Sequence, residues 1–115
     1  MSDPTLHTVR VALVAITKHG AKQVAALAPA LPRAEILVSE KVSSELGATT
    51  NKITIYSGAM KDEIAPLFAN YDQIVFFVSL GVVVRMIAPY LKSKEEDPGV
   101  IVVDDAGQFA IPVLS

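Results

Sequence analysis

Continuous runs of Val, Ile and other apolar residues recur along the chain and predict buried β-strands. The strongest runs are residues 9–17 (VRVALVAIT) and 73–78 (QIVFFV), and each is followed by a short polar or glycine-containing turn. Because these runs do not alternate between apolar and polar residues, they are typical of strands that are covered on both faces. Further strands are expected at residues 34–38, 53–56, 100–103 and 109–114.

Three segments between these strands have apolar residues one helical turn apart, which predicts amphipathic helices. They are residues 21–31, which Pro32 ends, residues 60–68, which contain Pro66, and residues 82–91, which contain Pro89. The polar stretch 40–51 is expected to be a loop with one helical turn around 42–46, and the charged stretch 92–99 a surface loop. Residues 104–107 (DDAG) are typical of a turn between two strands.

Alternating strands and helices predict an α/β fold. Right-handed crossovers would give a three-layer, open and mostly parallel sheet of the flavodoxin or Rossmann type, with helices on both faces. We expect the strand order 3-2-1-4-5, with the last strand antiparallel at the edge. The 115 residues suffice for one domain, over residues 9–115, after a flexible N-terminus of residues 1–8. Because the chain stops directly after a strand, we expect a piece of a longer protein.

The composition and charge of the chain argue against several classes of function. The formal net charge of −2 and the pI near 5.6 offer no basic field, so neither nucleic acid nor an anionic membrane is expected as a partner. The longest apolar stretch, residues 74–84, is too short to span a bilayer. The chain has no cysteine, which excludes disulfides and thiolate chemistry and agrees with a cytoplasmic location. No metal-ligand spacing occurs, so no metal site is expected.

The predicted topology places a candidate site where the strand order reverses, between the first and fourth strands. The two loops that follow these strands each lead into a helix N-terminus, which favours an anion such as carboxylate or phosphate. An equally weighted alternative is that the glycines of these loops only allow tight turns. The candidate binding residues are Thr17, Lys18, Gly20, Ser79, Gly81 and Arg85.

Two residues near this edge are candidates for proton transfer or for orienting a reacting group. His19 has the side chain whose ordinary pKa suits general acid–base chemistry, although an exposed loop histidine is more often inert. Asp104, at the end of the fifth strand, could orient a water or a substrate hydroxyl, or serve only the turn. Arg85 lies in an apolar helix, where it would bind an anion, pair with Asp104, or hold carbonyls that Pro89 releases.

The segments VALVAITKHGAKQVAAL and YDQIVFFVSLGVVVRMIAPYLKSKEEDPGVIVVDDAGQFAIPVLS resemble the N-terminal domains of cobalt-precorrin-5A hydrolases, the CbiG family of cobalamin biosynthesis. The most specific parts are Gly81 to Pro89 and Val102 to Gly107. The resemblance covers residues 9–115 and is weakest between residues 40 and 51. Leu80 departs from the pattern, because a small polar residue is expected there.

This resemblance implies an enzyme that opens the δ-lactone of cobalt-precorrin-5A and releases acetaldehyde to give cobalt-precorrin-5B. It implies a polycarboxylate substrate that itself carries the cobalt, so no cofactor of the protein is expected. It also implies further domains after this one, among which a fused precorrin methyltransferase is conceivable, and an isolated fragment without activity. The alternatives are a non-catalytic module that docks a neighbouring domain or a tetrapyrrole-pathway partner, and an unrelated small-anion-binding domain.

Overall fold

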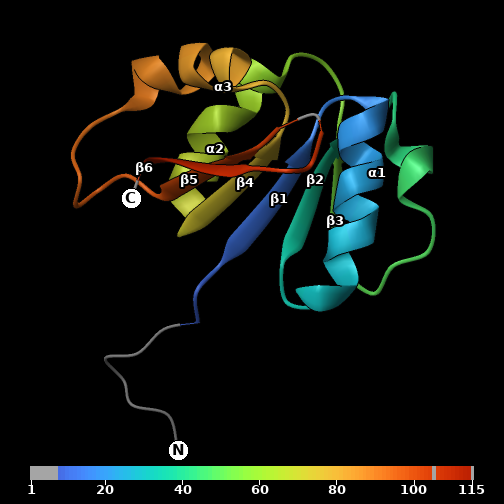
Figure 1. Cartoon of the computed structure of the whole chain (residues 1–115). Coiled ribbons are helices and arrows are strands. Elements are labelled where there is room, and N and C mark those ends of the chain that lie inside the picture. The colour runs from blue at the N-terminus through green and yellow to red at the C-terminus, as the bar shows by residue number, and fades with distance from the viewer. Residues whose placement is uncertain (1–7, 105, 115) are drawn as a thin grey trace, which may run out of the picture.

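The computed structural model describes residues 8–104 and 106–114. It contains one six-stranded sheet, in the order β3-β2-β1-β4-β5-β6, whose first five strands are parallel (Figure 1). The strands are β1 (Val11–Ala15), β2 (Glu35–Ser39), β3 (Ile53–Tyr56), β4 (Gln73–Phe77), β5 (Gly99–Val103) and β6 (Ala110–Leu114). The expected α/β class, the strand order and the antiparallel edge strand are confirmed. The expected flexible N-terminus lies, except for Thr8, outside the described residues.

The central strands are buried on both faces, as their continuous apolar sequences predict. In β1, Ala12 and Val14 face one apolar cluster, and Leu13 and Ala15 face the other. The side chains of β4 also alternate between the two faces, because Phe76 belongs to the first cluster and Phe77 to the second. Two cores therefore lie on opposite sides of one sheet.

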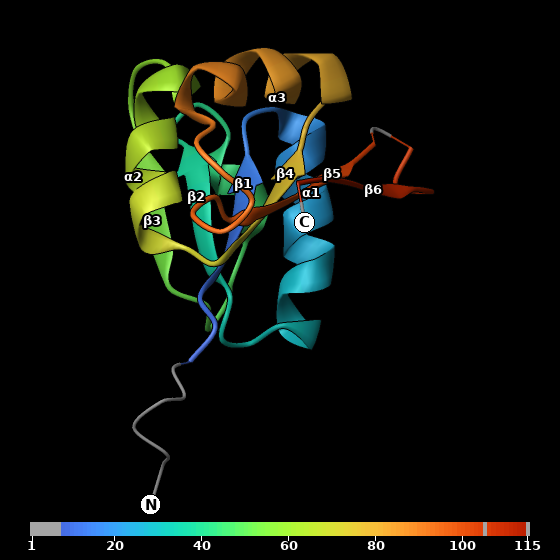
Figure 2. The ribbon, with the colours of Figure 1, turned by 90° about the vertical axis from the view of Figure 1, so that its left-hand side faces the viewer.

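Helix α1 (Lys18–Leu27) covers one face of the sheet and is continued by the 3₁₀ turn η1 (Ala28–Ala30) (Figure 2). It begins three residues before the expected start. The polar residues Lys18 and His19, which resemble loop sequence, form its first turn because the Thr17 hydroxyl caps it by accepting from the Gly20 N–H at 2.9 Å. Val24 and Ala28 turn toward the sheet and are buried.

Two helices belong to the other side of the sheet. The expected helix 60–68 is a 3₁₀ turn, η3 (Met60–Glu63), followed by α2 (Ile64–Asn70), which packs on the face opposite α1 (Figure 2). The expected helix 82–91 is α3 (Leu80–Ile87) with the 3₁₀ turn η4 (Ala88–Tyr90). α3 lies across the carboxyl ends of the strands, and Val83 and Ile87 turn into the core on the α2 side.

The polar stretch between β2 and β3 contains the 3₁₀ turn η2 (Ser43–Leu46), as expected. Asn51, which ends this stretch, is 6% exposed. Its amide nitrogen donates to the carbonyls of Leu31 and Ala34, both at 2.9 Å. Asn51 therefore ties the loop to the start of β2, a role that the sequence analysis did not assign.

The β5–β6 hairpin closes the sheet at one edge. Gly107 has a φ of 68°, a conformation that glycine adopts without strain, and its N–H donates to the Asp104 carbonyl at 2.9 Å. In β6, Pro112 stands opposite Ile101 beside a bulge in the pairing. No helix of the described residues is long and apolar enough to cross a bilayer.

Candidate functional site

The carboxyl ends of β1 and β4 are adjacent and in register. Ala15 is paired with Phe77, so Thr17 and Ser79, each two residues further on, occupy equivalent positions at the sheet edge. Thr17 is the N-cap of α1 and Ser79 the N-cap of α3. The structure therefore brings two helix N-termini together at the point where the strand order reverses, as expected.

The two glycines at these turns have different roles. Gly20 is buried, and a Cβ atom at this position would collide with the backbone oxygen of Phe77. At Gly81 a Cβ atom would meet nothing within 4 Å among the described residues, and its φ is not positive. Gly20 thus permits a close approach of α1 to β4, whereas no local backbone or packing demand requires glycine at residue 81.

The two helix N-termini also differ in whether a side chain already accepts a hydrogen bond from their first N–H groups. At α1 the Thr17 hydroxyl takes the N–H of Gly20, whereas in the described structure no side chain caps α3 at Ser79. Because the first N–H groups of a helix have no partner within it, the start of α3 is the better of the two positions for an added anion. Lys18 adds positive charge, although its Nζ lies 3.7 Å from the Glu45 carboxylate.

Gln23 connects α1 with the strand end that carries Asp104. Gln23 lies one helical turn after His19, and its Nε2 donates to the Asp104 carbonyl oxygen at 3.1 Å. One carboxylate oxygen of Asp104, Oδ1, accepts from the N–H groups of Gln108 and Phe109 at 3.0 and 3.1 Å. The first turns of α1 and the Asp104 turn therefore meet at the same edge, and the Asp104 carboxylate also stabilises its own turn.

Arg85 does not pair with Asp104, which was one of the alternatives for this residue. The buried residues of α3 are Val83 and Ile87, and Arg85 lies between them in sequence on the exposed side of the helix. Within the part of the chain that the structure describes, no hydrogen bond joins Arg85 to the carbonyls near Pro89 either. The guanidinium therefore extends into solvent near the carboxyl edge of the sheet.

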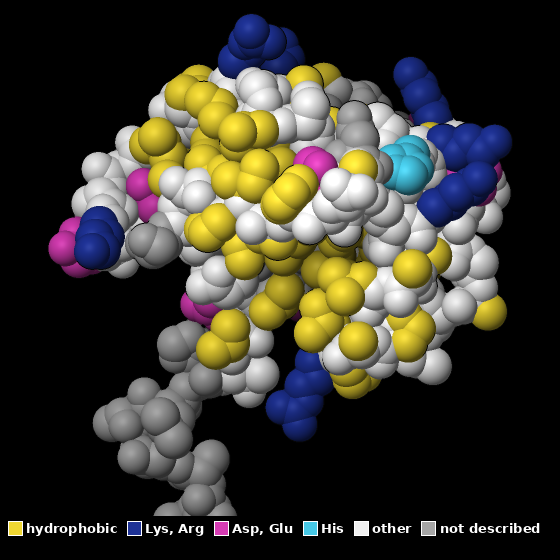
Figure 3. Space-filling view, viewed as in Figure 1, with side chains coloured by type: hydrophobic (Ala, Val, Ile, Leu, Met, Phe, Trp, Pro, Cys, Tyr) yellow, Lys and Arg dark blue, Asp and Glu magenta, His cyan; other side chains and the backbone are white. Residues whose placement is uncertain are grey.

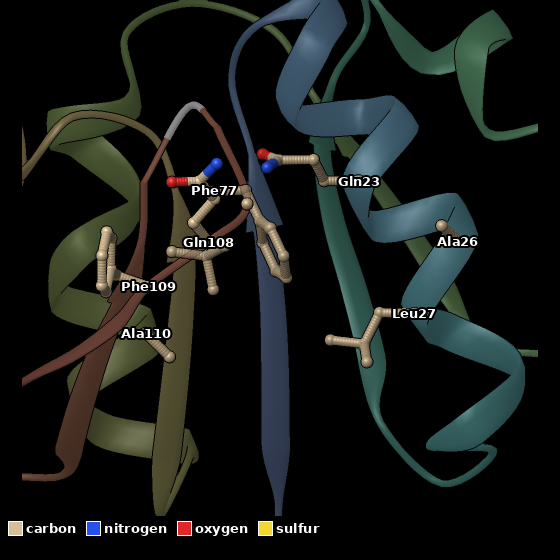
Figure 4. A pocket seen from close by; sticks show the side chains of 9 residues that line it. Gln23, Ala26, Leu27, Phe77, Gln108, Phe109 and Ala110 are labelled. Carbon is tan, nitrogen blue, oxygen red and sulfur yellow. The ribbon is translucent and has the colours of Figure 1, made fainter.

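An apolar groove of about 530 Å³ lies beside these turns, between α1 and the β5–β6 hairpin (Figure 4). Figure 3 shows apolar side chains gathered over this part of the surface and over α3. Residues that line it include Gln23, Ala26, Leu27, Phe77, Gln108 and Phe109. None of the eight predicted site residues lines this groove.

Sequence reasoning missed the groove because its walls come from segments about 80 residues apart. The side chains of Gln23 and Gln108 point toward each other's elements across its upper end (Figure 4). Phe109, which directly precedes β6, is 64% exposed. The sequence pattern predicts residue 109 as the start of a strand and so gave no sign of this exposed aromatic side chain.

The most strongly coupled charges lie at the opposite, amino-terminal edge of the sheet. Arg10 donates to the Glu35 carboxylate, with Nη2 3.0 Å from Oε2, and Tyr71 donates to Glu35 at 3.1 Å. Partial burial alone would raise the pKa of Glu35, but these hydrogen bonds and the charges of Arg10 and Lys52 hold this pKa below its ordinary value. The arrangement joins β1, β2 and the start of β4, so its role is structural.

Metal-ligating side chains do not gather at the candidate site. Within residues 8–104 and 106–114, no group of three or more His, Cys, Asp or Glu side chains is placed to hold a metal ion. The described chemistry at the carboxyl edge is instead that of helix N–H groups, two cations, a histidine, a carboxylate and an apolar groove.

Comparisons with known proteins agree on one family. The family model "Cobalamin synthesis G N-terminal" matches residues 62–115. The cobalt-precorrin-5A hydrolase of Priestia megaterium is 39% identical over 104 residues, which are 90% of this chain and 28% of that protein. The cobalt-precorrin-5A hydrolase of Salmonella typhimurium is 30% identical over 111 residues, or 96% of this chain and 30% of that protein. The chain thus spans less than a third of either relative.

A solved structure supports the fold. The crystal structure of a cobalamin biosynthesis protein G homolog from Sulfolobus solfataricus superimposes with a TM-score of 0.55 at 24% identity, over 90% of this chain and 28% of that one. This likeness shows the fold. The two hydrolases and the family match agree with the resemblance carried by the segments around residues 81–89 and 102–107. The chain belongs to the family of cobalamin synthesis G N-terminal domains.

Proposed function

We propose that this chain is the N-terminal domain of a cobalt-precorrin-5A hydrolase and supplies part of the site that binds the substrate. The complete enzyme would open the lactone of cobalt-precorrin-5A and release acetaldehyde to give cobalt-precorrin-5B. The observation that carries the proposal is the in-register pairing of Ala15 with Phe77, which brings two helix N-termini to one edge of the sheet. The similarity to two cobalt-precorrin-5A hydrolases supplies the substrate class.

Each candidate residue then has a definite role. The N-terminal turn of α3, which begins after Ser79 and includes Gly81, would bind a carboxylate of the macrocycle through backbone N–H groups. Arg85 and Lys18 would bind further carboxylates at the two sides of this edge, and Thr17 and Gly20 would fix the start of α1. The cobalt belongs to the substrate, so the chain itself would need no metal.

Proton transfer would fall to the residues on the α1 side of the site. His19 would act as general acid or base, because an imidazole can both accept and donate a proton. Asp104 would orient the substrate or a water, and Gln23 would hold the Asp104 turn against α1 through its hydrogen bond to the Asp104 carbonyl. We also propose a cytoplasmic location and further catalytic domains, including a fused methyltransferase as one form that these domains could take.

The test of this proposal separates binding from turnover. We expect the 115-residue chain to bind cobalt-precorrin-5A in an absorbance titration and to release no acetaldehyde above background. In the complete enzyme, Lys18→Ala and Arg85→Ala should lower turnover and leave assembly unchanged, with Lys94→Ala, in the surface loop, as the matched control. Loss of assembly with intact turnover per assembled enzyme would favour the alternative, a non-catalytic docking module.

A further inference from the structure

The face of the sheet that carries α1 is only partly covered. α1 packs against β1, β2 and the end of β4, and the other two helices contribute their buried residues to the opposite side. β5 is followed by a hairpin and not by a helix. The α1 face of β5, with the partly buried Val103, therefore borders the 530 Å³ groove beside the buried Phe77 of β4. A parallel sheet is normally buried on both faces. Here, apolar residues that are typical of a protein interior border a groove that is open at the surface.

The groove offers apolar contact and the side-chain amides of Gln23 and Gln108. Among the residues that the structure describes, no charged side chain lines it. Gln23 uses its Nε2 to donate to the Asp104 carbonyl, which directs Oε1 away from that bond. This Oε1 atom is buried and has no hydrogen-bond partner among the described residues. A buried acceptor without a donor costs free energy, so the occupant that fits should bring an N–H or O–H group.

These properties of the groove favour a protein segment over the substrate as its occupant. Ionised carboxylates, which surround the proposed substrate, are acceptors only and favour cations. They match the helix N-termini, Lys18 and Arg85, and they do not match a mainly apolar groove that has no charged side chain among its described lining residues. An apolar helix face or extended segment with one donor matches both the apolar walls and Gln23.

We propose that the groove between α1 and the β5–β6 hairpin seats an apolar segment of the rest of the enzyme, with a donor on that segment satisfying Gln23 Oε1. The source follows from length: the matched region is only 28% of the Priestia megaterium hydrolase and 30% of the Salmonella typhimurium one, so these relatives carry a much longer portion outside it. The inference rests on the proposed function only where it assigns the docked segment to the same hydrolase. Phe109, 64% exposed beside the groove, would become buried on docking.

Thiol labelling tests the proposal, because the chain contains no cysteine of its own. Ala26→Cys places a thiol in the groove, and Ala69→Cys places one on the exposed side of α2, on the other face of the sheet. Both variants are prepared in the 115-residue chain and in the complete product of the reading frame that encodes it. Maleimide labelling is followed at each site by peptide mass spectrometry.

We expect both thiols to react at similar rates in the 115-residue chain. In the complete product, the thiol of Ala26→Cys should react at least about tenfold more slowly, and that of Ala69→Cys at an unchanged rate, because a docked thiol reacts only when the interface opens. In the complete product, Gln23→Leu should restore part of the labelling rate of Ala26→Cys by removing the acceptor.

Each other outcome overturns the proposal. Equal labelling of Ala26→Cys in both proteins, or a reading frame that ends at Ser115, leaves no segment to fill the groove. Protection that appears in the 115-residue chain as its concentration rises assigns the groove to a second copy. Protection of the 115-residue chain by cobalt-precorrin-5A assigns it to the substrate. The proposed function is tested separately by the substrate titration, so the two can fail independently.

Discussion

The backbone oxygen of Phe77 occupies the space in which a side chain at Gly20 would begin. This contact joins the first turn of α1 to the end of β4, directly at the point where the strand order reverses. It sets how closely the helix approaches the sheet, and therefore where the N-terminus of α1 lies relative to that of α3.

Gly20→Ala should destabilise the domain by about 1–3 kcal/mol, because the added methyl group must displace backbone on one side or the other. Gly81→Ala is the matched control: it lies in the first turn of α3 with open space around it. That variant should be neutral or more stable by up to ~1 kcal/mol, since alanine favours helix. Urea unfolding measures both, and equal effects would contradict the different roles of the two glycines.

Sulfate or acetate should bind at the converging helix N-termini. In amide NMR titrations we expect shifts at residues 79–81, where no described side chain caps the helix, and smaller shifts at residues 17–20, where Thr17 already binds the Gly20 N–H. The charged loop 92–97 provides the internal control. Shifts confined to that loop would show that the anions bind to surface lysines and not to the helix N-termini.

Arg85→Lys should leave the melting temperature of the chain unchanged, because in the described structure the guanidinium is exposed and holds neither Asp104 nor a backbone carbonyl. In the complete enzyme the same change should raise KM for cobalt-precorrin-5A more than it lowers kcat, since lysine keeps the charge and loses bidentate geometry. A lower melting temperature with unchanged kinetics would remove Arg85 from the proposed site.

Acid should weaken the domain through Glu35. Its pKa lies below the ordinary value in the folded chain, so the unfolded chain binds the proton more readily. The stabilisation is complete above the ordinary glutamate pKa, about 4.3, and is lost as the pH falls through the lower folded value. Urea unfolding between pH 7 and pH 3 should therefore show a shallower pH dependence for Glu35→Gln than for the wild-type chain. An identical dependence would contradict this assignment.

The parts of the fold that follow from local sequence were predictable. The continuous apolar runs of β1 and β4 identified central strands of a parallel sheet, and their order followed from the handedness of crossovers. Helix boundaries were less accurate for a physical reason. Lys18 and His19 look like loop residues until the cap by Thr17 is known, and Pro66 and Pro89 shift helical residues into 3₁₀ turns without ending the segments.

The candidate site was predictable only as far as topology determines it. Strand order alone places the ends of β1 and β4 side by side, and the register of Ala15 with Phe77 agrees. The ion pair of Arg85 with Asp104, one of the alternatives, does not form, because helical spacing does not determine how α3 is rotated about its axis; anion binding by Arg85 stays a prediction. The hydrogen bond from Gln23 to Asp104 joins residues that are 81 positions apart, and the local sequence around either residue does not predict it.

Pro112 limits how the sheet can grow. An edge strand exposes a row of backbone N–H and C=O groups that another chain can extend, and a proline supplies no N–H for such pairing. The bulge beside Pro112 disturbs the same edge further. Proline and bulge together make β6 a poor template for a further strand, so association of this domain at that end through side chains is favoured over a continued sheet.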